Sequence, residues 1–192
     1  MKKLVLVLIL AICMGGMTFA LDFLSYPDCI QPGSIMISPG FKLGNFYGLK
    51  MALGITVAGD YALPISFPLT VGLETGFVKV TNIPLIAIPI LVRAQYHPDL
   101  GISKLDVYAT LKLGWSIGMF TDDYHNSNKA GGGFSFGTNV GAKYFFTDFL
   151  GAFLELGYDY YAMRYKWSGG GLSGTHTWYI YTFLTTGVTL KF

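Results

Sequence analysis

The chain has 192 residues, of which 52% are apolar, 16% aromatic and only 12% charged, whereas a soluble domain carries about 25% charged residues. This composition excludes a disordered chain, which would be rich in charge and poor in aromatic residues. A formal net charge of +2 also excludes the broad basic surface that binding to nucleic acid requires. The excess of apolar side chains must therefore contact either an unusually large core or lipid.

The first twenty residues have the layout of a signal peptide. Lys2 and Lys3 precede the apolar stretch 4–12, and Thr18-Phe19-Ala20 forms a small-x-small cleavage site. The apolar stretch is shorter than the roughly 20 residues of a membrane-spanning helix, and a lipoprotein assignment is disfavoured because the bulky Ile12 precedes Cys13. We therefore expect residues 1–20 to direct Sec export, residues 21–33 to form a periplasmic lead-in, and residues 34–192 to form the folded domain. Cleavage leaves 11 basic and 11 acidic residues and Cys29 as the single cysteine.

After the signal peptide, the apolar residues recur with a period of two. In 105–119 every odd-numbered residue is apolar, and the even-numbered ones are polar, tyrosine or glycine. Such alternation is typical of a strand with one apolar face. The segment 85–96 is apolar on both faces until Arg93, and in 178–192 we expect Trp178, Ile180 and Thr182 to face outward. The predicted strands are 35–43, 47–57, 69–77, 85–96, 105–119, 134–146, 150–163 and 178–192.

These segments predict a membrane protein built from strands. No segment after the signal peptide is long enough for a membrane-spanning helix, and a bilayer interior admits only helices and closed barrels. Each predicted strand has about the 9–11 residues needed to cross a bilayer at a tilt. We predict an all-β fold, an eight-stranded antiparallel up-and-down transmembrane β-barrel.

The charged residues fit this prediction. Outward parity holds only Lys79 and Arg164, both at strand ends, where a lipid-facing cation costs little. A water-soluble periplasmic β protein, the alternative, would have its charges outside. The predicted inward charges, which we expect to form a network in the lumen, are Lys42, Lys50, Glu74, Arg93, Asp106, Lys112, Lys143, Glu155 and Asp159.

Loop lengths and aromatic residues predict an orientation. The connections 121–133 and 165–177 are long and rich in Gly, Ser, Asn and Asp, whereas 147–149 is short. Outer-membrane barrels have short periplasmic turns and longer external loops, so we expect the two long connections outside, where they can contact an extracellular ligand of unknown identity. The link 58–68 is longer than a periplasmic turn should be. Aromatic rings favour the membrane interfaces; we assign Tyr47, Phe77, Trp115, Phe134, Tyr160 and Trp178 to the outer one, and Tyr96, Phe146 and Phe192 to the inner one.

Two stretches resemble a known group of proteins. The segment 141–158, GAKYFFTDFLGAFLELGY, resembles the penultimate hairpin of OmpA/OmpX-like small outer-membrane barrels, and the segment 186–192, TGVTLKF, resembles the end of their last strand. The resemblance implies the outer membrane of a diderm bacterium, with membrane lipid and lipopolysaccharide or an equivalent as neighbours. It also implies that Phe192 is the signal read by the barrel-assembly machinery. Leu190 departs from the aromatic residue that many members carry there.

The residues predicted to face the lumen indicate a closed barrel that does not transport solutes. An eight-stranded barrel is just wide enough for side chains to fill it, and the inward cations and acids are nearly balanced, so we expect them to pair. We therefore predict a closed lumen, no cofactor, and a structural or surface-contact role through the external loops. The alternative is a small pore for small solutes.

Catalysis and metal binding have weaker support. His125-x-Ser127-Asn128 resembles a motif of barrel lipid A deacylases, in which a His base activates a Ser nucleophile. In that family the motif lies on a strand near the chain end, whereas here it lies in a loop, where Ser and Asn are common. The three histidines lie far apart and no cluster has ligand spacing. We predict no enzymatic activity and no metal site.

Overall fold

The computed structural model describes residues 25–46, 50–83, 85–120, 131–169 and 172–192, with the side chains of 120 and 165–176 left aside. Within these ranges the chain forms eight strands that close into one barrel. No helix in them is long and apolar enough to cross a membrane. The strands are β1 (Ile35–Phe46), β2 (Lys50–Ala62), β3 (Leu69–Val80), β4 (Leu85–Tyr96), β5 (Leu105–Phe120), β6 (Gly132–Phe145), β7 (Leu150–Gly169) and β8 (Leu172–Lys191).

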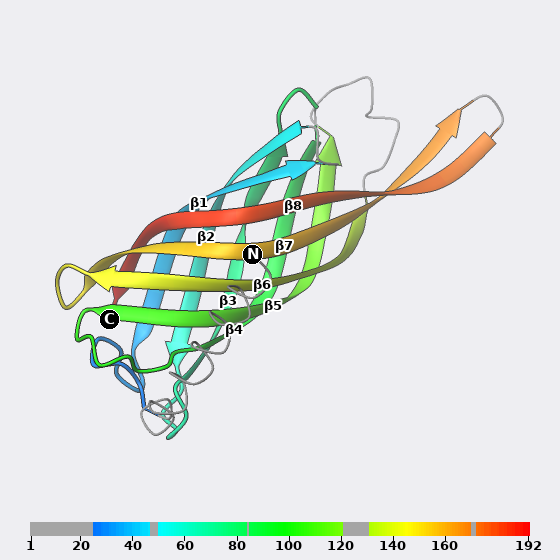
Figure 1. Ribbon diagram of the computed structural model, residues 1–192. Helices are drawn as coiled ribbons and strands as arrows, with labels where there is room; N and C mark the ends of the chain where they lie inside the picture. The colour runs from blue at the N-terminus through cyan, green and yellow to red at the C-terminus, as the bar shows by residue number, and fades with distance from the viewer. Residues whose placement is uncertain (1–24, 47–49, 84, 121–130, 170–171) are drawn as a thin grey trace, which may run out of the picture.

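Each strand pairs antiparallel with its neighbours in sequence. Pairing between β1 and β8 closes the sheet, so the tilted strands surround a common axis (Figure 1). Closure satisfies the backbone groups that an open sheet would leave at its two edges. The predicted eight-stranded antiparallel up-and-down barrel is confirmed.

The two ends of the barrel differ. We call the end with the connections 63–68, 97–104 and 146–149 the turn end; residues 25–34 and Phe192 also lie there. The opposite end, the loop end, carries the connections that follow β1, β3, β5 and β7. There β7 and β8 stay paired as far as Gly169 and Leu172, and this hairpin projects beyond the other strands (Figure 1). The prediction that 165–177 is a loop is therefore wrong for most of that range, because backbone pairing continues without apolar alternation.

The second strand also differs from its prediction. β2 runs from Lys50 to Ala62, so the link expected over 58–68 contains only residues 63–68. Gly59 and Asp60 resemble a turn in sequence, but both remain paired, with Leu73 and Gly72 of β3.

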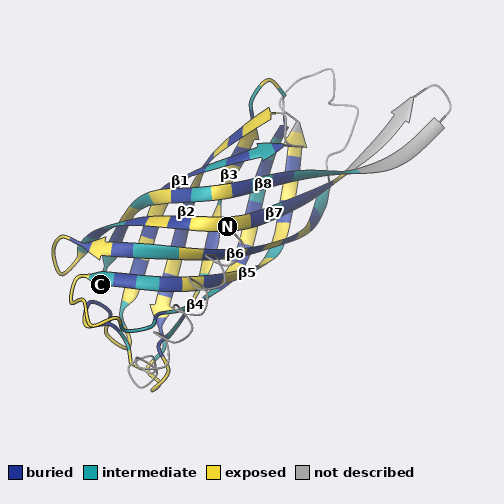
Figure 2. Ribbon diagram, in the orientation of Figure 1, coloured by how far each residue is buried: buried dark blue, intermediate teal, exposed yellow. Residues whose placement is uncertain are grey.

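Alternate residues along each strand face opposite environments (Figure 2). On the exterior, Leu111 is 65% exposed and Val140 62%, whereas Lys112 and Lys143 on the interior are 0% and 1% exposed. A water-soluble barrel would have the opposite distribution, because hydration stabilises charged side chains far more than hydrocarbon ones. The middle of the exterior wall is therefore apolar, and the charged residues at that height lie inside the barrel.

A β-bulge reverses this alternation in the loop-end half of β8. The partner of Leu43 is Leu184 and that of Gly44 is Thr182, so Phe183 is an extra residue. The bulge turns Ile180 and Thr182 inward, to 0% and 1% exposure, and Trp178 packs against buried interior residues. The predictions that Trp178, Ile180 and Thr182 face outward, and that Trp178 marks the outer interface, are therefore wrong.

Apolar layers occupy both ends of the interior, which the sequence had predicted to be polar throughout. At the turn end, the segment 25–34 enters the barrel and packs Cys29 and Ile30 against Met36 and Phe145. The segment 85–96 is apolar on both faces because its inward residues Leu85, Ala87 and Leu91 lie in an apolar layer at the loop end. This layer also contains Phe46, Ala52, Val78, Val80, Tyr161, Met163 and Ile180.

Candidate functional site

Between the two apolar layers, seven charged side chains fill the middle of the barrel. They come from six strands, because inward positions at the same height meet at the barrel axis. All are at most 3% exposed. We call this group the central cluster: Lys42 (β1), Asp60 (β2), Glu74 (β3), Arg93 (β4), Lys112 (β5), and Glu155 and Asp159 (β7).

The guanidinium of Arg93 contacts three carboxylates. Its Nε lies 3.1 Å from Oδ1 of Asp60. Its Nη1 lies 2.9 Å from Oε2 of Glu74, and its Nη2 2.7 Å from Oε1 of Glu155. A planar guanidinium presents its donors in a fixed fork, so this one side chain sets the relative positions of β2, β3, β4 and β7.

Two lysines complete the central cluster. Nζ of Lys42 lies 2.5 Å from Glu74 Oε1 and 2.6 Å from Asp159 Oδ2. Nζ of Lys112 lies 3.0 Å from both Glu74 Oε2 and Glu155 Oε2, and 3.4 Å from Asp159 Oδ2. Each cation therefore contacts at least two acids, which offsets the cost of removing these charges from water.

Neutral donors add hydrogen bonds to Glu155 and Asp159, whereas Oδ2 of Asp60 is buried without a hydrogen-bond donor among the described residues. Tyr108 donates to Oε1 of Glu155 at 3.1 Å, and Asn139 donates through Nδ2 to Oδ1 of Asp159 at 2.7 Å. Asp159 also accepts from Thr182 at 3.2 Å. Residue 137 is glycine where the Asp159 side chain passes, and a Cβ at this position would collide with Oδ1 of Asp159.

A second polar layer lies between the central cluster and the turn end. Nδ1 of His97 is 2.8 Å from Oδ1 of Asp106, and its Nε2 is 3.0 Å from the Thr70 hydroxyl. Nζ of Lys143 is 3.6 Å from Oδ2 of Asp106, donates to Oε1 of Gln95 at 3.2 Å, and lies 4.3 Å from the centre of the Tyr108 ring. Tyr108 therefore joins this layer to the central cluster.

The interior charges nearly balance. The buried cations are Lys42, Arg93, Lys112 and Lys143, and the buried carboxylates are Asp60, Glu74, Asp106, Glu155 and Asp159. Four cations therefore face five acids. His97 is 0% exposed and contacts Asp106 through Nδ1.

The structure brings together eight of the nine residues assigned to the lumen network. The exception is Lys50, which is exposed at the first position of β2; its assignment to the lumen is wrong because the barrel interior ends before this position. The sequence did not identify Asp60 as a lumen residue, because the link predicted over 58–68 placed it outside any strand. It also missed His97, which continues the inward parity of Arg93 and Gln95 by one further step.

The other predicted residues are distributed as follows. Phe77, Trp115 and Phe134 are exposed on the exterior, and Tyr160 stacks against the Tyr179 ring with the ring centres 5.1 Å apart. Tyr47, His125 and Ser127 lie outside the described residues, so neither the first interface assignment nor the catalytic motif is tested. Among the described residues, no three His, Cys, Asp or Glu side chains are arranged so that they could hold a metal ion.

A closed eight-stranded antiparallel barrel with an apolar exterior is the fold of small outer-membrane β-barrel proteins. Two solved structures share it with this chain. The outer membrane protein OprG from Pseudomonas aeruginosa has a TM-score of 0.58 and 13% identity, over 89% of this chain and 99% of that chain. Neisserial surface protein A has a TM-score of 0.56 and 14% identity, over 83% of this chain and 96% of that chain. At these identities the likeness concerns the fold alone. No family model matches the sequence, and neither does any curated protein.

Proposed function

We propose that the chain is an integral outer-membrane protein with a closed interior and no catalytic activity, whose role is structural or is exerted through surface contacts at the loop end. The observation that carries the proposal is the inverted distribution of residues. Leu73, Leu111 and Val140 on the exterior are each more than 60% exposed, while the charges are inside. Lipid is the solvent that favours such a wall.

The ion pairs support a closed interior. A hydrated ion that passed along the axis would have to separate Arg93 from its acids, and breaking one buried ion pair costs about 3–5 kcal/mol. The apolar layers at both ends would have to open as well, since the N-terminal segment packs Ile30 into the turn end. The lumen therefore favours a rigid, sealed barrel over a pore.

The proposal includes a route and an orientation. Residues 1–20 would direct export by the Sec pathway, and Phe192 would be the residue that the assembly machinery reads. The projecting β7–β8 hairpin would then lie outside the cell and the turn end in the periplasm. The external partner of the hairpin would be a ligand on a neighbouring cell or surface, while lipid and lipopolysaccharide would surround the wall.

Refolding and conductance test the proposal together. The chain should refold into detergent and migrate faster in electrophoresis when it is not boiled, because a closed sheet resists cold detergent. In a planar bilayer it should give no stable single-channel steps, with a general porin as the positive control. Discrete steps from the refolded protein would instead establish the small pore. Failure to insert into detergent or lipid would overturn the membrane assignment.

Lipid analysis tests the absence of catalysis. Cells that produce the chain should contain unmodified lipid A, and Ser127→Ala should change nothing. Loss of an ester-linked chain from lipid A that depends on Ser127 would overturn this part of the proposal.

A further inference from the structure

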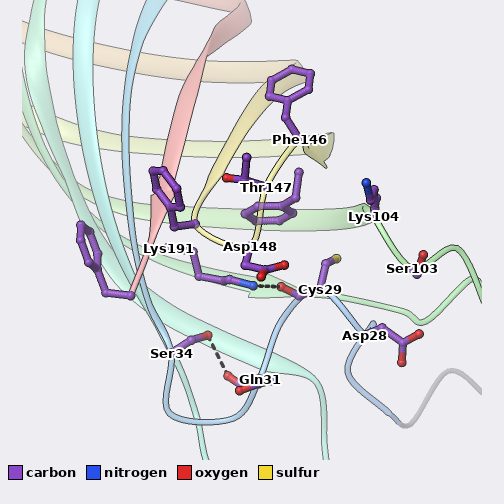
Figure 3. A pocket seen from close by; sticks show the side chains of 13 residues that line it. Asp28, Cys29, Gln31, Ser34, Ser103, Lys104, Phe146, Thr147, Asp148 and Lys191 are labelled. Carbon is purple, nitrogen blue, oxygen red and sulfur yellow. Dashed lines mark hydrogen bonds between the residues drawn. The ribbon is translucent and has the colours of Figure 1, made fainter.

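A cavity of about 460 Å³ lies at the turn end, outside the ion-paired interior. Four parts of the chain surround it: the N-terminal segment, the connection before β5, the β6–β7 connection and the end of β8 (Figure 3). Its volume falls in the range of small-molecule sites, about 300–1,000 Å³. The cavity is therefore large enough for the polar head of a lipid.

The lining carries charges of both signs. Lys104 and Lys191 provide two ammonium groups, and Asp28 and Asp148 provide two carboxylates (Figure 3). Within the described part of the chain, no ion pair uses Lys104, Asp28 or Asp148. Nζ of Lys191 donates to the Cys29 carbonyl at 2.8 Å, and this leaves two of its three N–H groups for another partner.

Two hydroxyl groups add to this capacity. Ser34 donates to the Gln31 carbonyl at 2.7 Å, so its oxygen can accept a further hydrogen bond. Thr147 accepts from the Leu150 N–H at 3.0 Å, so its hydroxyl hydrogen is available to a ligand oxygen. The cavity therefore offers donors and acceptors at once.

The rim of the cavity is aromatic. Phe146, Phe149 and Phe192 line it and are 55%, 57% and 71% exposed. They stand where the apolar exterior wall ends, which is the level at which the headgroups of a surrounding bilayer begin. An occupant with a polar head and apolar chains would contact both the charges and these rings.

We propose that this cavity binds the headgroup of a zwitterionic phospholipid that carries a primary ammonium group, as phosphoethanolamine does. The lysines contact the phosphate, the aspartates contact the ammonium group, and the acyl chains lie along the exposed phenylalanines. This inference rests on the proposed membrane location. A choline headgroup carries the same charges, but its methylated nitrogen has no N–H to donate to a carboxylate.

Lipid retention in nanodiscs tests the assignment. The refolded chain is placed in discs with equal parts of phosphatidylethanolamine, phosphatidylcholine and phosphatidylglycerol, and the lipids retained after extraction are counted by native mass spectrometry. We expect the ethanolamine lipid to exceed the choline lipid about fivefold, as one partly exposed ion pair allows. Asp148→Asn should reduce this ratio toward one, whereas Lys104→Met should lower retention of both lipids. Lys79→Met, at an exposed exterior lysine of the loop end, is the matched control.

Three outcomes would overturn the assignment: equal retention of all three lipids, preference for the anionic lipid, or the same loss with Lys79→Met. Soluble glycerophosphoethanolamine, which has no acyl chains, should bind the protein in phospholipid-free micelles much more weakly than the lipid does. Equal binding would assign the site to free solutes instead. Electrophoresis without boiling is run on every variant, so that failure of the barrel to form is distinguished from failure of the lipid site.

Discussion

Arg93 on β4 donates through Nη2 to Oε1 of Glu155 on β7 at 2.7 Å, although 62 positions separate them in the sequence. β4 and β7 are not neighbours in the sheet, so this contact crosses the interior. The same guanidinium also reaches Asp60 on β2 and Glu74 on β3. Contacts of this kind hold opposite walls of the barrel together independently of the backbone hydrogen bonds.

Removal of the Arg93 charge should destabilise the barrel strongly. Arg93→Met leaves three buried carboxylates with one cation fewer, and breaking a buried ion pair from one side costs about 3–5 kcal/mol. The measurement is the free energy of urea unfolding of the refolded chain in lipid vesicles. Lys79→Met, which removes an exposed cation from the exterior, should change this free energy by less than about 0.5 kcal/mol. Equal effects of the two substitutions would show that the central cluster does not stabilise the fold.

Cys29 should react slowly with alkylating reagents in the folded protein. Burial raises the pKa of its thiol to about 11, and the nearby Asp106 carboxylate acts in the same direction. At pH 8 such a thiol is ionised about 200-fold less than one at the ordinary value of about 8.5. Iodoacetamide labelling, followed by mass spectrometry, should therefore be slow until urea unfolds the chain. Rapid labelling of the folded protein would mean that the N-terminal segment does not fill the turn end.

The same pKa predicts how the stability depends on pH. Because the folded-state pKa lies above the unfolded one, the contribution of the protonated thiol is complete below about pH 8.5 and is lost as the pH rises toward 11. Cys29→Ala removes this titration, so the difference in unfolding free energy between the original chain and Cys29→Ala should shrink above pH 8.5. A constant difference across this range would contradict the raised pKa.

Much of the barrel could be predicted because successive residues of a strand face two different environments. Side chains that contact lipid are apolar, whereas charged side chains face the interior and are paired there. The alternation in 105–119 is therefore visible in the sequence and matches β5. The starts of β1, β3, β4, β5 and β7 agree with the predicted residues for the same reason. Parity placed Lys42, Glu74 and Asp159 inside.

The rest depends on information that parity does not contain. A single extra residue, Phe183, reverses the faces of Trp178 and Ile180, and a bulge has no apolar signature of its own. Which acid meets which cation depends on the tilt and stagger of the strands around the barrel. The packing of Ile30 into the turn end is a long-range contact of a segment that has no alternation.

The reversal in β8 should be visible by fluorescence. Trp115 is 49% exposed on the exterior wall, whereas Trp178 packs edge-on against Phe46, with ring centres 5.6 Å apart. Two single-tryptophan variants are prepared by replacing the other two tryptophans with phenylalanine. In vesicles of brominated lipid, the Trp115 variant should be quenched strongly and the Trp178 variant weakly. Equal quenching would place Trp178 on the exterior and remove the evidence for the bulge.

A lysine placed on the exterior wall should reveal which solvent surrounds the barrel. Leu111→Lys, in the middle of β5, should lower the unfolding free energy in vesicles by about 2–4 kcal/mol, because a bilayer midplane solvates charge poorly. Met119→Lys is the matched control, on the same face of the same strand near the loop end, and it should cost about 0–1 kcal/mol. Water would tolerate both changes equally, since both side chains are already at least half exposed, at 65% and 50%. A small and equal effect at the two positions would therefore show that the wall faces water, and a steep decline from Leu111 to Met119 is what a surrounding bilayer requires.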